Sequence, residues 1–351
     1  MAGNANLGAA KAAKNDEFYT QWNDIENEMQ AYLKYNPNVF RGKTILLPCD
    51  DPDWSSFTKY FDERFEQLGL KKLISTSCAA DGGNGKVFVL EGENKPQWGY
   101  LAGDGDFRSD EVTALRDEAD IVVTNPPFSL FREFMAWLIE GEVEFSVIGN
   151  MNAVTYKEIF PLIKDNKMWP GAAFNKAMEF AVPADYYAAK DAELDKYGNR
   201  LVKVPAIAWF TNIEHGRRHE LLELMTLEDN LVYGSKKVRS AGYPNYDNYD
   251  AVEVPFTSGI PSDYEGVMGV PISFLGKYNP EQFEIVKFRH GDDGKDLGYT
   301  QEDGTYKTPY FRILIRHRNP ERKESQPLSR SRGGQSSLRC KRGLSHVEVR
   351  G

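Results

Sequence analysis

The sequence Ile-Val-Val-Thr-Asn-Pro-Pro-Phe occupies residues 121–128 and decides how the rest of the chain is interpreted. It begins with apolar, β-branched residues, which are typical of a buried parallel strand. The two prolines cannot donate hydrogen bonds to a sheet, so the strand must end at Asn125. A helical periodicity follows over residues 129–140. The stretch therefore predicts a rigid polar turn at the carboxyl end of a central strand, where open α/β sheets bind ligands.

Strand and helix patterns alternate around this stretch. Strands are predicted at residues 43–47, 72–78 and 144–150, a hairpin at 87–101, and helices at 25–33, 55–68, 109–118 and 156–162. This order predicts an α/β fold with a Rossmann-like mixed, mainly parallel sheet and helices on both faces. Strands at residues 178–183 and 205–211 flank a charged loop, so we expect them to pair antiparallel.

Composition changes along the chain indicate its domain organisation. Beyond His215 the sequence becomes rich in Tyr, Asp, Gly and Pro, and after about residue 318 apolar periodicity is lost. We expect a disordered N-terminus at residues 1–14, an α/β domain at 15–214, a smaller C-terminal region at 215–316 and a disordered basic tail at 317–351. The tail resembles an out-of-frame or foreign extension.

The overall composition limits the class of protein. The 351 residues are 41% hydrophobic and 27% charged, as in soluble globular proteins. No apolar run of about 18 residues exists and the N-terminus lacks a signal-peptide core, so we expect a cytoplasmic protein with no membrane partner. Cys49, Cys78 and Cys340 are few and the histidines are dispersed, which predicts neither a disulfide framework nor a metal site. A net charge of −9 does not itself favour nucleic-acid binding, although a local basic cleft can provide it.

The turn after the central strand combines groups that suit a planar amine. The side-chain oxygen of Asn125 and the carbonyl of Pro126 can each accept one N–H bond from an exocyclic amino group. Accepting both bonds localises the nitrogen lone pair for in-line attack on a sulfonium methyl. Phe128 can stack on an extruded base. A rigid strand exit without chemistry is the alternative, but the position of the turn in a βα series favours function.

Two other segments are candidates for a nucleotide site. The turn Pro48-Cys49-Asp50-Asp51 ends the first strand of the βαβ unit, where Rossmann-like folds bind their nucleotide. The alternative is a cap on the next helix, through Asp53 or Ser55. The loop Gly-Asp-Gly-Asp-Phe at residues 103–107 is either an ordinary turn or a support for an adenosine ring. No G-x-G-x-x-G fingerprint is present, which argues against a dehydrogenase.

These motifs together resemble the γ-type amino methyltransferases, and more narrowly the EcoRI-type adenine-specific DNA methyltransferase family. The resembling stretches lie at residues 15–20, 49–52, 125–128, 209–212, 243–249 and 266–271. They include Phe-Tyr-Thr at residues 18–20 and the Asn-Pro-Pro-Phe turn. The resemblance extends from about residue 13 to Arg316, although the turn at 48–52 lacks the glycines that most methyltransferases have there.

The resemblance implies site-specific transfer of a methyl group from S-adenosylmethionine to N6 of adenine in double-stranded DNA, by base flipping. Residues 15–214 would form the catalytic domain and residues 215–316 the DNA target-recognition region. The implied cofactor contacts are Phe18, Tyr19, Thr20, Pro48, Cys49, Asp50, Asp106 and Phe107. The implied catalytic residues are Asn125, Pro126, Pro127 and Phe128. Without the resemblance, Thr20 is expected to cap the helix that follows it.

Candidate DNA contacts are Trp209, Phe210, Arg217, Arg218, Lys236, Lys237 and Arg239. Core packing of the two aromatic residues and a solvated charged face are the alternatives. We expect a bacterial or phage-encoded enzyme with a possible cognate restriction endonuclease that shares its site without forming a stable complex. Transfer to cytosine N4 or to protein glutamine N5 stays open, as does a catalytically inactive DNA-binding relative.

Overall fold

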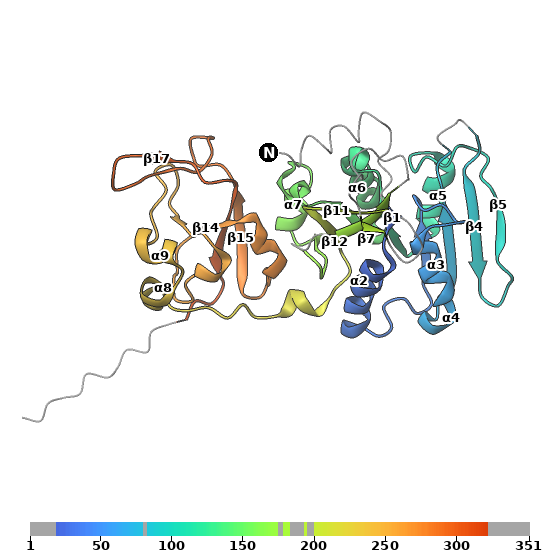
Figure 1. Ribbon diagram of the computed structural model, residues 1–351, viewed down its shortest axis with the longest axis horizontal. Coiled ribbons are helices and arrows are strands. Elements are labelled where there is room, and N and C mark those ends of the chain that lie inside the picture. The colour runs from blue at the N-terminus through green and yellow to red at the C-terminus, as the bar shows by residue number, and fades with distance from the viewer. Residues whose placement is uncertain (1–18, 80–82, 175–177, 183–192, 195–199, 322–351) are drawn as a thin grey trace, which may run out of the picture.

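A computed structural model describes residues 19–79, 83–174, 178–182, 193–194 and 200–321. Its largest element is an eight-stranded sheet with the order β5-β4-β3-β2-β6-β7-β12-β8 (Figure 1). The central strands β3 (Lys72–Thr76), β2 (Thr44–Leu47), β6 (Ile121–Thr124) and β7 (Glu144–Asn150) run parallel. Antiparallel strands flank them: β4 (Lys86–Glu91) and β5 (Gln97–Tyr100) at one edge, β12 (Ile207–Thr211) and β8 (Trp169–Pro170) at the other. The predicted mixed sheet is confirmed.

Helices cover both faces of this sheet, as predicted. One face packs against α2 (Trp22–Tyr35), α3 (Ser56–Glu63) and α4 (Phe65–Leu68), and the other against α5 (Asp110–Glu118), α6 (Phe131–Glu140) and α7 (Phe160–Lys164). The strand alternation explains how both faces become apolar, because successive side chains point to opposite sides. In β6, Ile121 and Val123 join the core under α2 and α3, whereas Val122 joins the core under α5 and α6.

Two predicted helices differ from those observed. The helix expected at residues 55–68 is divided at Arg64 into α3 and α4, since Arg64 leaves helical geometry with ψ near 8°. The helix expected at residues 156–162 lies later, as α7, and a 3₁₀ turn η2 (Met151–Thr155) precedes it. The other 3₁₀ turns are η1 (Phe128–Leu130), η3 (Gly216–His219), η4 (Thr257–Gly259) and η5 (Ile272–Lys277).

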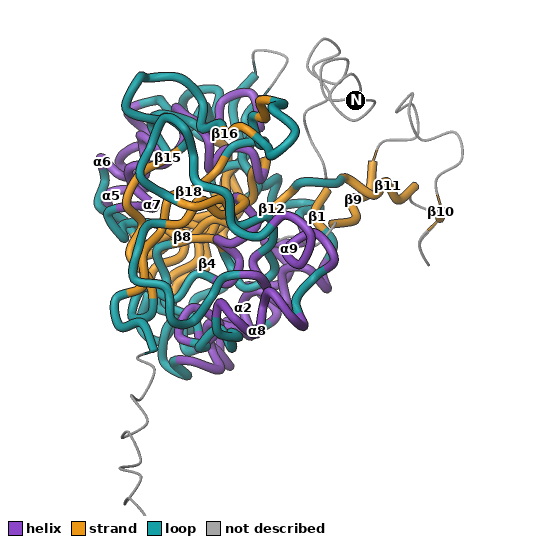
Figure 2. Tube along the Cα trace, turned by 90° about the vertical axis from the view of Figure 1, so that its left-hand side faces the viewer, coloured by secondary structure: helices purple, strands orange, loops and turns teal. Residues whose placement is uncertain are grey.

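The strands at 178–183 and 205–211 do not pair, so that prediction is wrong. Instead β9 (Met178–Val182) pairs with β11 (Arg200–Val204), while β12 pairs with β7 in the large sheet. β1 (Tyr19–Thr20) and β10 (Glu193–Leu194) complete a small sheet of order β1-β9-β11-β10. Figure 2 shows this sheet projecting from the body of the molecule. The chain changes sheets at Ala206, which has a left-handed φ of 61°.

Beyond β12 the chain builds a second region around a four-stranded sheet, at the opposite end of the molecule from β5 (Figure 1). The sheet contains β13 (Val252–Glu253), β14 (Met268–Pro271), β18 (Arg312–His317) and β15 (Phe283–Phe288), in that order. Helices α8 (Leu227–Tyr233) and α9 (Lys236–Ala241) and a small hairpin, β16 (Tyr299–Thr300) with β17 (Tyr306–Lys307), accompany it. Phe160 of α7 stacks on Phe288 of β15 at 4.7 Å, within one hydrophobic core cluster that extends from the large sheet into this second region.

The ordered C-terminal part extends past its predicted boundary, and the predicted N-terminal boundary lies outside the described residues. The C-terminal tail was predicted from residue 317, but His317 is buried in β18 and Glu321 donates a backbone hydrogen bond to Ser262. The predicted disorder at residues 1–14 and after 321 concerns segments outside the described residues. No helix within the described part of the chain is long and apolar enough to span a membrane.

Candidate active site

A cavity of about 400 Å³ opens at the carboxyl ends of β2, β3 and β6. β2 pairs with β3 on one side and with β6 on the other, so the cavity lies at a topological switch point, where α/β sheets bind ligands. Its volume falls in the range of small-molecule sites. Its lining comes from five separate segments, namely Thr20, Pro48, Cys49, Asp50, Asp51, Trp54, Ser55, Ser56, Phe57, Ser77, Cys78, Gly105, Asp106, Phe107, Asn125, Pro127 and Leu130.

The Asn-Pro-Pro-Phe turn forms one wall of this cavity. Asn125 and Pro127 line it directly, and Pro126 between them is buried. The carbonyl of Pro127 accepts a hydrogen bond from the N–H of Leu130 at 3.0 Å, which holds the turn against η1. Phe128 is half-buried and packs against the core under α2 and α3. The structure thus brings the predicted acceptor turn and the predicted cofactor turn to the same space.

Asp50 occupies the floor of the cavity and is held by two hydroxyl groups. Its Oδ1 accepts a hydrogen bond from Ser55 at 2.8 Å, and its Oδ2 accepts one from Thr124 at 2.6 Å. Ser55 caps α3 by accepting hydrogen bonds from the N–H groups of Phe57 and Thr58. Burial raises the pKa of Asp50 to about 7, although both hydroxyls favour the ionised form. The two interpretations of this turn therefore both apply, since Ser55 caps a helix while Asp50 faces the cavity.

The loop at residues 103–107 closes the cavity from the side of β3. Gly105 has φ of 84°, and a Cβ at this position would collide with the carbonyl oxygen of Ser77, so only glycine fits. The carboxylate of Asp106 receives Nε and Nη2 of Arg108 at 2.9 and 2.6 Å, which holds the pKa of Asp106 below its usual range. Phe107 is 4% exposed and packs edge-on against aromatic rings of α6, so it supports the loop from the core.

Thr20 brings an unsatisfied hydroxyl to the cavity. It lies in β1, is 4% exposed, and its Oγ1 has no hydrogen-bond partner among the described residues. Leaving a buried hydroxyl unpaired costs about 1–3 kcal/mol, which a bound ligand would recover. The alternative capping role is wrong, because α2 begins at Trp22 with Gln21 at the capping position. Tyr19 contributes its backbone to β1, and Phe18 lies outside the described residues.

Six residues that line the cavity were not singled out from the sequence, namely Trp54, Ser56, Phe57, Ser77, Cys78 and Leu130. Ser77 and Cys78 follow β3, and their predicted strand position already placed them at the same edge as Asp50. Trp54 lies in the loop after β2 and is 41% exposed, so its indole offers the cavity an accessible aromatic face. In the sequence, the only indication that Trp54 lines a site is its position as an aromatic residue within a polar loop. At the cavity mouth, Lys86 forms an ion pair with Asp51 at 2.9 Å.

Comparison with known proteins identifies the family. A family model described as adenine-specific methyltransferase EcoRI matches residues 6–318. The chain belongs to this family. The Type II methyltransferase M.EcoRI of Escherichia coli is 45% identical over 342 residues, which cover 91% of this chain and 99% of that relative. M.MgeORF184P of Mycoplasma genitalium is 44% identical over 280 residues, covering 79% of this chain and 84% of the relative. No solved structure matches the chain.

Membership of the EcoRI adenine-specific methyltransferase family confirms three predictions: the family, the Rossmann-like α/β fold, and a methyltransferase that acts on adenine. M.MpnI of Mycoplasma pneumoniae, also a Type II methyltransferase, is 39% identical over 280 residues that cover 79% of this chain and 83% of the relative. The cytosine-N4 and glutamine-N5 alternatives lose their support, since the family description names adenine. The match ends at residue 318, before most of the predicted tail.

The predicted DNA contacts of Trp209 and Phe210 do not agree with their positions. Both residues lie in β12 with no exposed surface. The Trp209 ring packs edge-on against Phe57 at 5.9 Å, and Phe210 packs against Phe131 at 5.4 Å. A strand residue in the middle of a covered sheet cannot reach DNA while the fold is intact. Core packing, the alternative considered for both residues, replaces the predicted contact.

The basic cluster at residues 217–219 mostly serves the junction between the two regions. Arg218 is 4% exposed, lies 3.7 Å over the ring of Trp169, and pairs with Glu214 at 3.3 Å. A phosphate cannot reach it there, so burial corrects the predicted contact of Arg218. Half-buried Arg217 donates a hydrogen bond from Nη1 to the carbonyl of Ala172, which occupies one side of its guanidinium.

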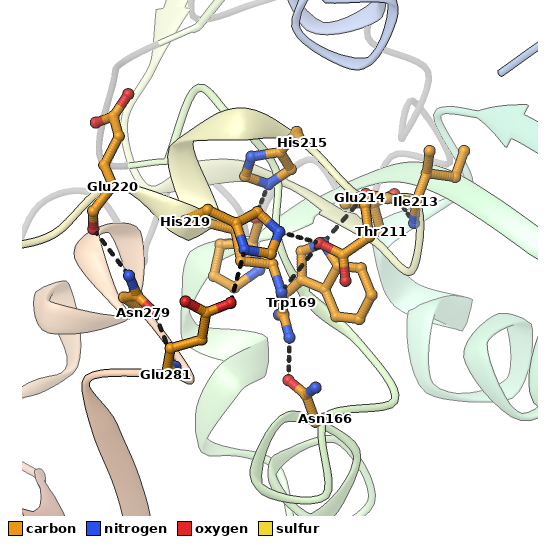
Figure 3. Close-up of polar contacts among 12 residues, drawn as sticks. Asn166, Trp169, Thr211, Ile213, Glu214, His215, His219, Glu220, Asn279 and Glu281 are labelled. Carbon is orange, nitrogen blue, oxygen red and sulfur yellow. Dashed lines mark hydrogen bonds and ion pairs between the residues drawn. The ribbon is translucent and has the colours of Figure 1, made fainter. Parts of the chain in front are cut away.

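The same junction contains contacts that connect the two regions (Figure 3). His219 lies between two carboxylates, 3.0 Å from Glu214 and 3.6 Å from Glu281. Asn279 donates a hydrogen bond from Nδ2 to the carbonyl of Glu220 at 3.3 Å. Glu281 and Asn279 belong to the C-terminal region, whereas Glu214 follows β12. Segment 214–220 is therefore held to both regions.

Buried His215 should make folding sensitive to acid. Its Nε2–H donates to the carbonyl of Pro170 at 3.1 Å, and burial lowers its pKa. The unfolded chain, with an ordinary His pKa of about 6.5, takes up a proton before the folded chain does. Stability from this group is thus present above about pH 6.5 and lost as the pH falls below it. We expect the His215→Gln variant to show a smaller drop in urea midpoint between pH 7.5 and 5.5 than the wild type. The exposed-site variant His290→Gln is the control, and equal drops in all three proteins would exclude His215 as the cause.

Proposed function

We propose that the cavity binds S-adenosylmethionine and that the Asn125 turn presents adenine N6 of double-stranded DNA to it after base flipping. The observation that carries this proposal is the shared cavity: the acceptor turn after β6 and the acidic turn after β2 line one space at the switch point of the sheet. The family supplies the reaction class. We also propose residues 15–214 as the catalytic domain and residues 215–316 as the DNA target-recognition region.

The lining of the cavity suits the proposed methyl donor. S-adenosylmethionine supplies an electrophilic methyl group on a positively charged sulfur, and its amino-acid part carries an ammonium group. Asp50 places a carboxyl group at the cavity, which favours bound positive charge when it is ionised, whereas Asp106 is already paired with Arg108. The buried hydroxyl of Thr20 needs a polar partner, and the exposed ring of Trp54 can stack on adenine. Pro48, Cys49 and Phe107 supply apolar surface.

The acceptor turn would activate the amine by orienting it. The Asn125 side-chain oxygen is buried, and the Pro126 carbonyl belongs to a peptide whose proline lacks an N–H, so the turn presents acceptors in a stiff backbone. Two hydrogen bonds accepted from N6 draw the nitrogen toward tetrahedral geometry and direct its lone pair at the methyl carbon. The N–C bond forms as the bond from carbon to sulfur breaks, and N6 then loses a proton.

Methyl transfer with labelled cofactor tests the proposal directly. The protein is incubated with methyl-labelled S-adenosylmethionine and duplex DNA, and the DNA is then digested to nucleosides. We expect the label in N6-methyladenine at one short recurring sequence. Label in N4-methylcytosine or in protein would refute adenine N6 as the acceptor, and no cofactor binding would refute the proposed cavity. The reaction needs no stable complex with a cognate endonuclease.

Helix α9 is the best-placed candidate for DNA phosphate contact. Lys236, Lys237 and Arg239 are exposed on it, and only Val238 of this helix is buried. None of the three cations forms an ion pair with a described residue, in a chain whose net charge is −9. Lys237 lies 5.3 Å over the ring of Phe256, which is 43% exposed. A cluster of cations without ion-pair partners allows an acidic protein to bind a polyanion such as DNA.

Removing the α9 cations should weaken DNA binding in a salt-dependent way. The triple variant Lys236→Ala, Lys237→Ala, Arg239→Ala loses up to three phosphate contacts. Because each contact contributes about 0.9 to the slope of log K against log salt, we expect that slope to become shallower by about 2–3. Fluorescence anisotropy with duplex DNA at salt concentrations of about 50 to 200 mM measures this slope.

A matched triple variant controls for the loss of surface charge. Lys34, Lys71 and Lys95 are exposed on the α/β region, and Lys71 and Lys95 lie at the sheet end opposite the cavity. Replacing these three by alanine should leave the salt slope unchanged. If both triple variants change the slope equally, the effect is one of net charge and α9 has no specific contact.

A further inference from the structure

We propose that Thr124 is a positioning residue of the methyl-transfer site, which ties the acceptor turn to the cofactor turn through its hydrogen bond to Asp50. This inference rests on the proposed function, since it concerns how the same cavity recognises a positively charged methyl donor. Thr124 does not line the cavity itself. It acts on the site through Asp50, through the neighbouring Cys49 and through the residue that follows it.

The geometry places Thr124 between the two halves of the site. It is the last residue of β6, has no exposed surface, and directly precedes Asn125. Its hydroxyl donates to Oδ2 of Asp50 at 2.6 Å, from one parallel strand end to the next. Asp50 is also held at its backbone, because its N–H donates to the carbonyl of Thr76 at 2.9 Å and its carbonyl accepts from Ser75 at 2.7 Å. The bond to Thr124 thus fixes the start of the acceptor turn against a rigid support.

Thr124 is the one residue of β6 that carries a hydroxyl group. The three residues before Thr124 are aliphatic, and valine has the same shape as threonine without the polar group. Burying a hydroxyl costs free energy unless it is hydrogen-bonded, so a valine would satisfy the packing alone. The hydroxyl therefore contributes through the hydrogen bond that it donates to the Asp50 carboxylate, and it also contacts the Cys49 thiol.

The groups around Asp50 determine its protonation. On its own turn lie Cys49, whose thiol is neutral because burial raises its pKa, and the hydroxyl of Ser55. From β6 comes the Thr124 hydroxyl. Cys78 at the end of β3 and the Asp106 carboxylate, which Arg108 neutralises, act on the neighbouring Cys49 thiol. At the mouth, Lys86 pairs with both Asp51 and Asp53, so this group carries one net negative charge.

Loss of the Thr124 hydrogen bond is expected to change the pKa of Asp50. Burial favours the neutral acid, while the hydroxyls of Thr124 and Ser55 favour the carboxylate, and the pKa of Asp50 is about 7 as a result. Without one of the two hydroxyls the pKa rises, so Asp50 is protonated at neutral pH. A protonated Asp50 gives less stabilisation to a sulfonium or ammonium group. Cofactor binding should then require a higher pH.

The test is the pH dependence of cofactor binding in Thr124→Val. Calorimetric titration of the full-length protein with S-adenosylmethionine at pH values from about 6 to 9 gives the dissociation constant at each pH. This range brackets the pKa of Asp50, which is about 7. In the wild type we expect affinity to increase as the pH rises through about 7. In Thr124→Val we expect the midpoint to lie about one unit higher, with affinity reduced up to about tenfold at low pH and recovered at high pH.

Two controls separate this role from simple loss of a buried hydrogen bond. Thr76→Val removes a fully buried hydroxyl that donates to the carbonyl of Pro48 at 3.2 Å on the next strand, without touching the Asp50 carboxylate. It should leave the midpoint where it is. Asp50→Asn should abolish the titration in both the wild-type and the Thr124→Val background. A midpoint in Thr124→Val equal to that of the wild type, or one that Thr76→Val shifts equally, overturns the inference. Failure of the wild type to bind S-adenosylmethionine at any pH would instead overturn the proposed function.

Discussion

Asn125→Ala is expected to reduce the rate of methyl transfer by a factor on the order of 10²–10³ while leaving DNA affinity within about twofold. Removing one preorganised hydrogen-bonding group from a transition state typically costs this much. Asn125 lies in the cavity wall, whereas the exposed cations of α9 lie in the C-terminal region, so the variant changes the acceptor without changing the proposed phosphate contacts. Single-turnover transfer with labelled cofactor and anisotropy with unmethylated duplex measure the two quantities separately.

The neighbouring strand offers a matched control for this variant. Asn150 ends β7 as Asn125 follows β6, and its side chain accepts a hydrogen bond from the N–H of Asn152 at 2.9 Å to cap η2. It does not line the cavity. Asn150→Ala should therefore lose some stability and keep its single-turnover rate. Transfer by Asn125→Ala at the wild-type rate would remove this side chain from the mechanism and favour a turn that acts by shape alone.

The site could be predicted because local sequence determines its parts. A run of β-branched residues ending in two prolines allows only a buried strand with an abrupt exit, and the parallel order of the strands then places the exits of β2, β3 and β6 at one edge. Asn125 and Asp50 were assigned to the same crevice from this reasoning. The hydrogen bond from Thr124 to Asp50 could not be predicted, because it depends on side-chain positions on two strands that are 74 residues apart in sequence.

The strand pairing near residue 205 could not be predicted for a different reason. Both β11 and β12 are apolar enough to pair with β9, and the sequence shows no boundary except Pro205. Ala206 adopts a left-handed backbone that non-glycine residues rarely use, so the propensity of alanine argues against the turn. Tertiary contact overrides it: the carbonyl of Ala206 accepts a hydrogen bond from the N–H of Met151 at 2.6 Å, which holds the corner beside β7.

Residues whose chemistry is ambiguous were misassigned where burial decides their role. Arg218 belongs to a basic triplet that would suit DNA, yet the ring of Trp169 and the carboxylate of Glu214 bury it at the junction. Glu214 is near in sequence, but Trp169 comes from a distant segment that no local pattern places beside Arg218. The cations of α9 have the same local appearance and remain exposed. Local sequence identifies charge, whereas its accessibility follows from the assembled fold.

Trp209→Ala is expected to lower the free energy of unfolding by about 3–5 kcal/mol and to leave DNA affinity of the folded protein unchanged. Removing a fully buried indole from β12 leaves a cavity between the large sheet and α3, where Phe57 packs edge-on against it. Chemical unfolding in urea measures the first quantity, and anisotropy without denaturant, at a temperature where circular dichroism shows the variant folded, measures the second.

Trp209→Phe distinguishes packing from polar contact at the same position. The indole Nε1 is buried and has no hydrogen-bond partner in the part of the chain that the structure describes, so phenylalanine removes volume without breaking a hydrogen bond. We expect a loss of about 1–2 kcal/mol, well below that of alanine. A DNA contact predicts the opposite pattern, in which both variants stay nearly as stable as the wild type and both bind DNA more weakly. That result would mean that β12 is uncovered when DNA binds, and the buried position of Trp209 would then describe only the free enzyme.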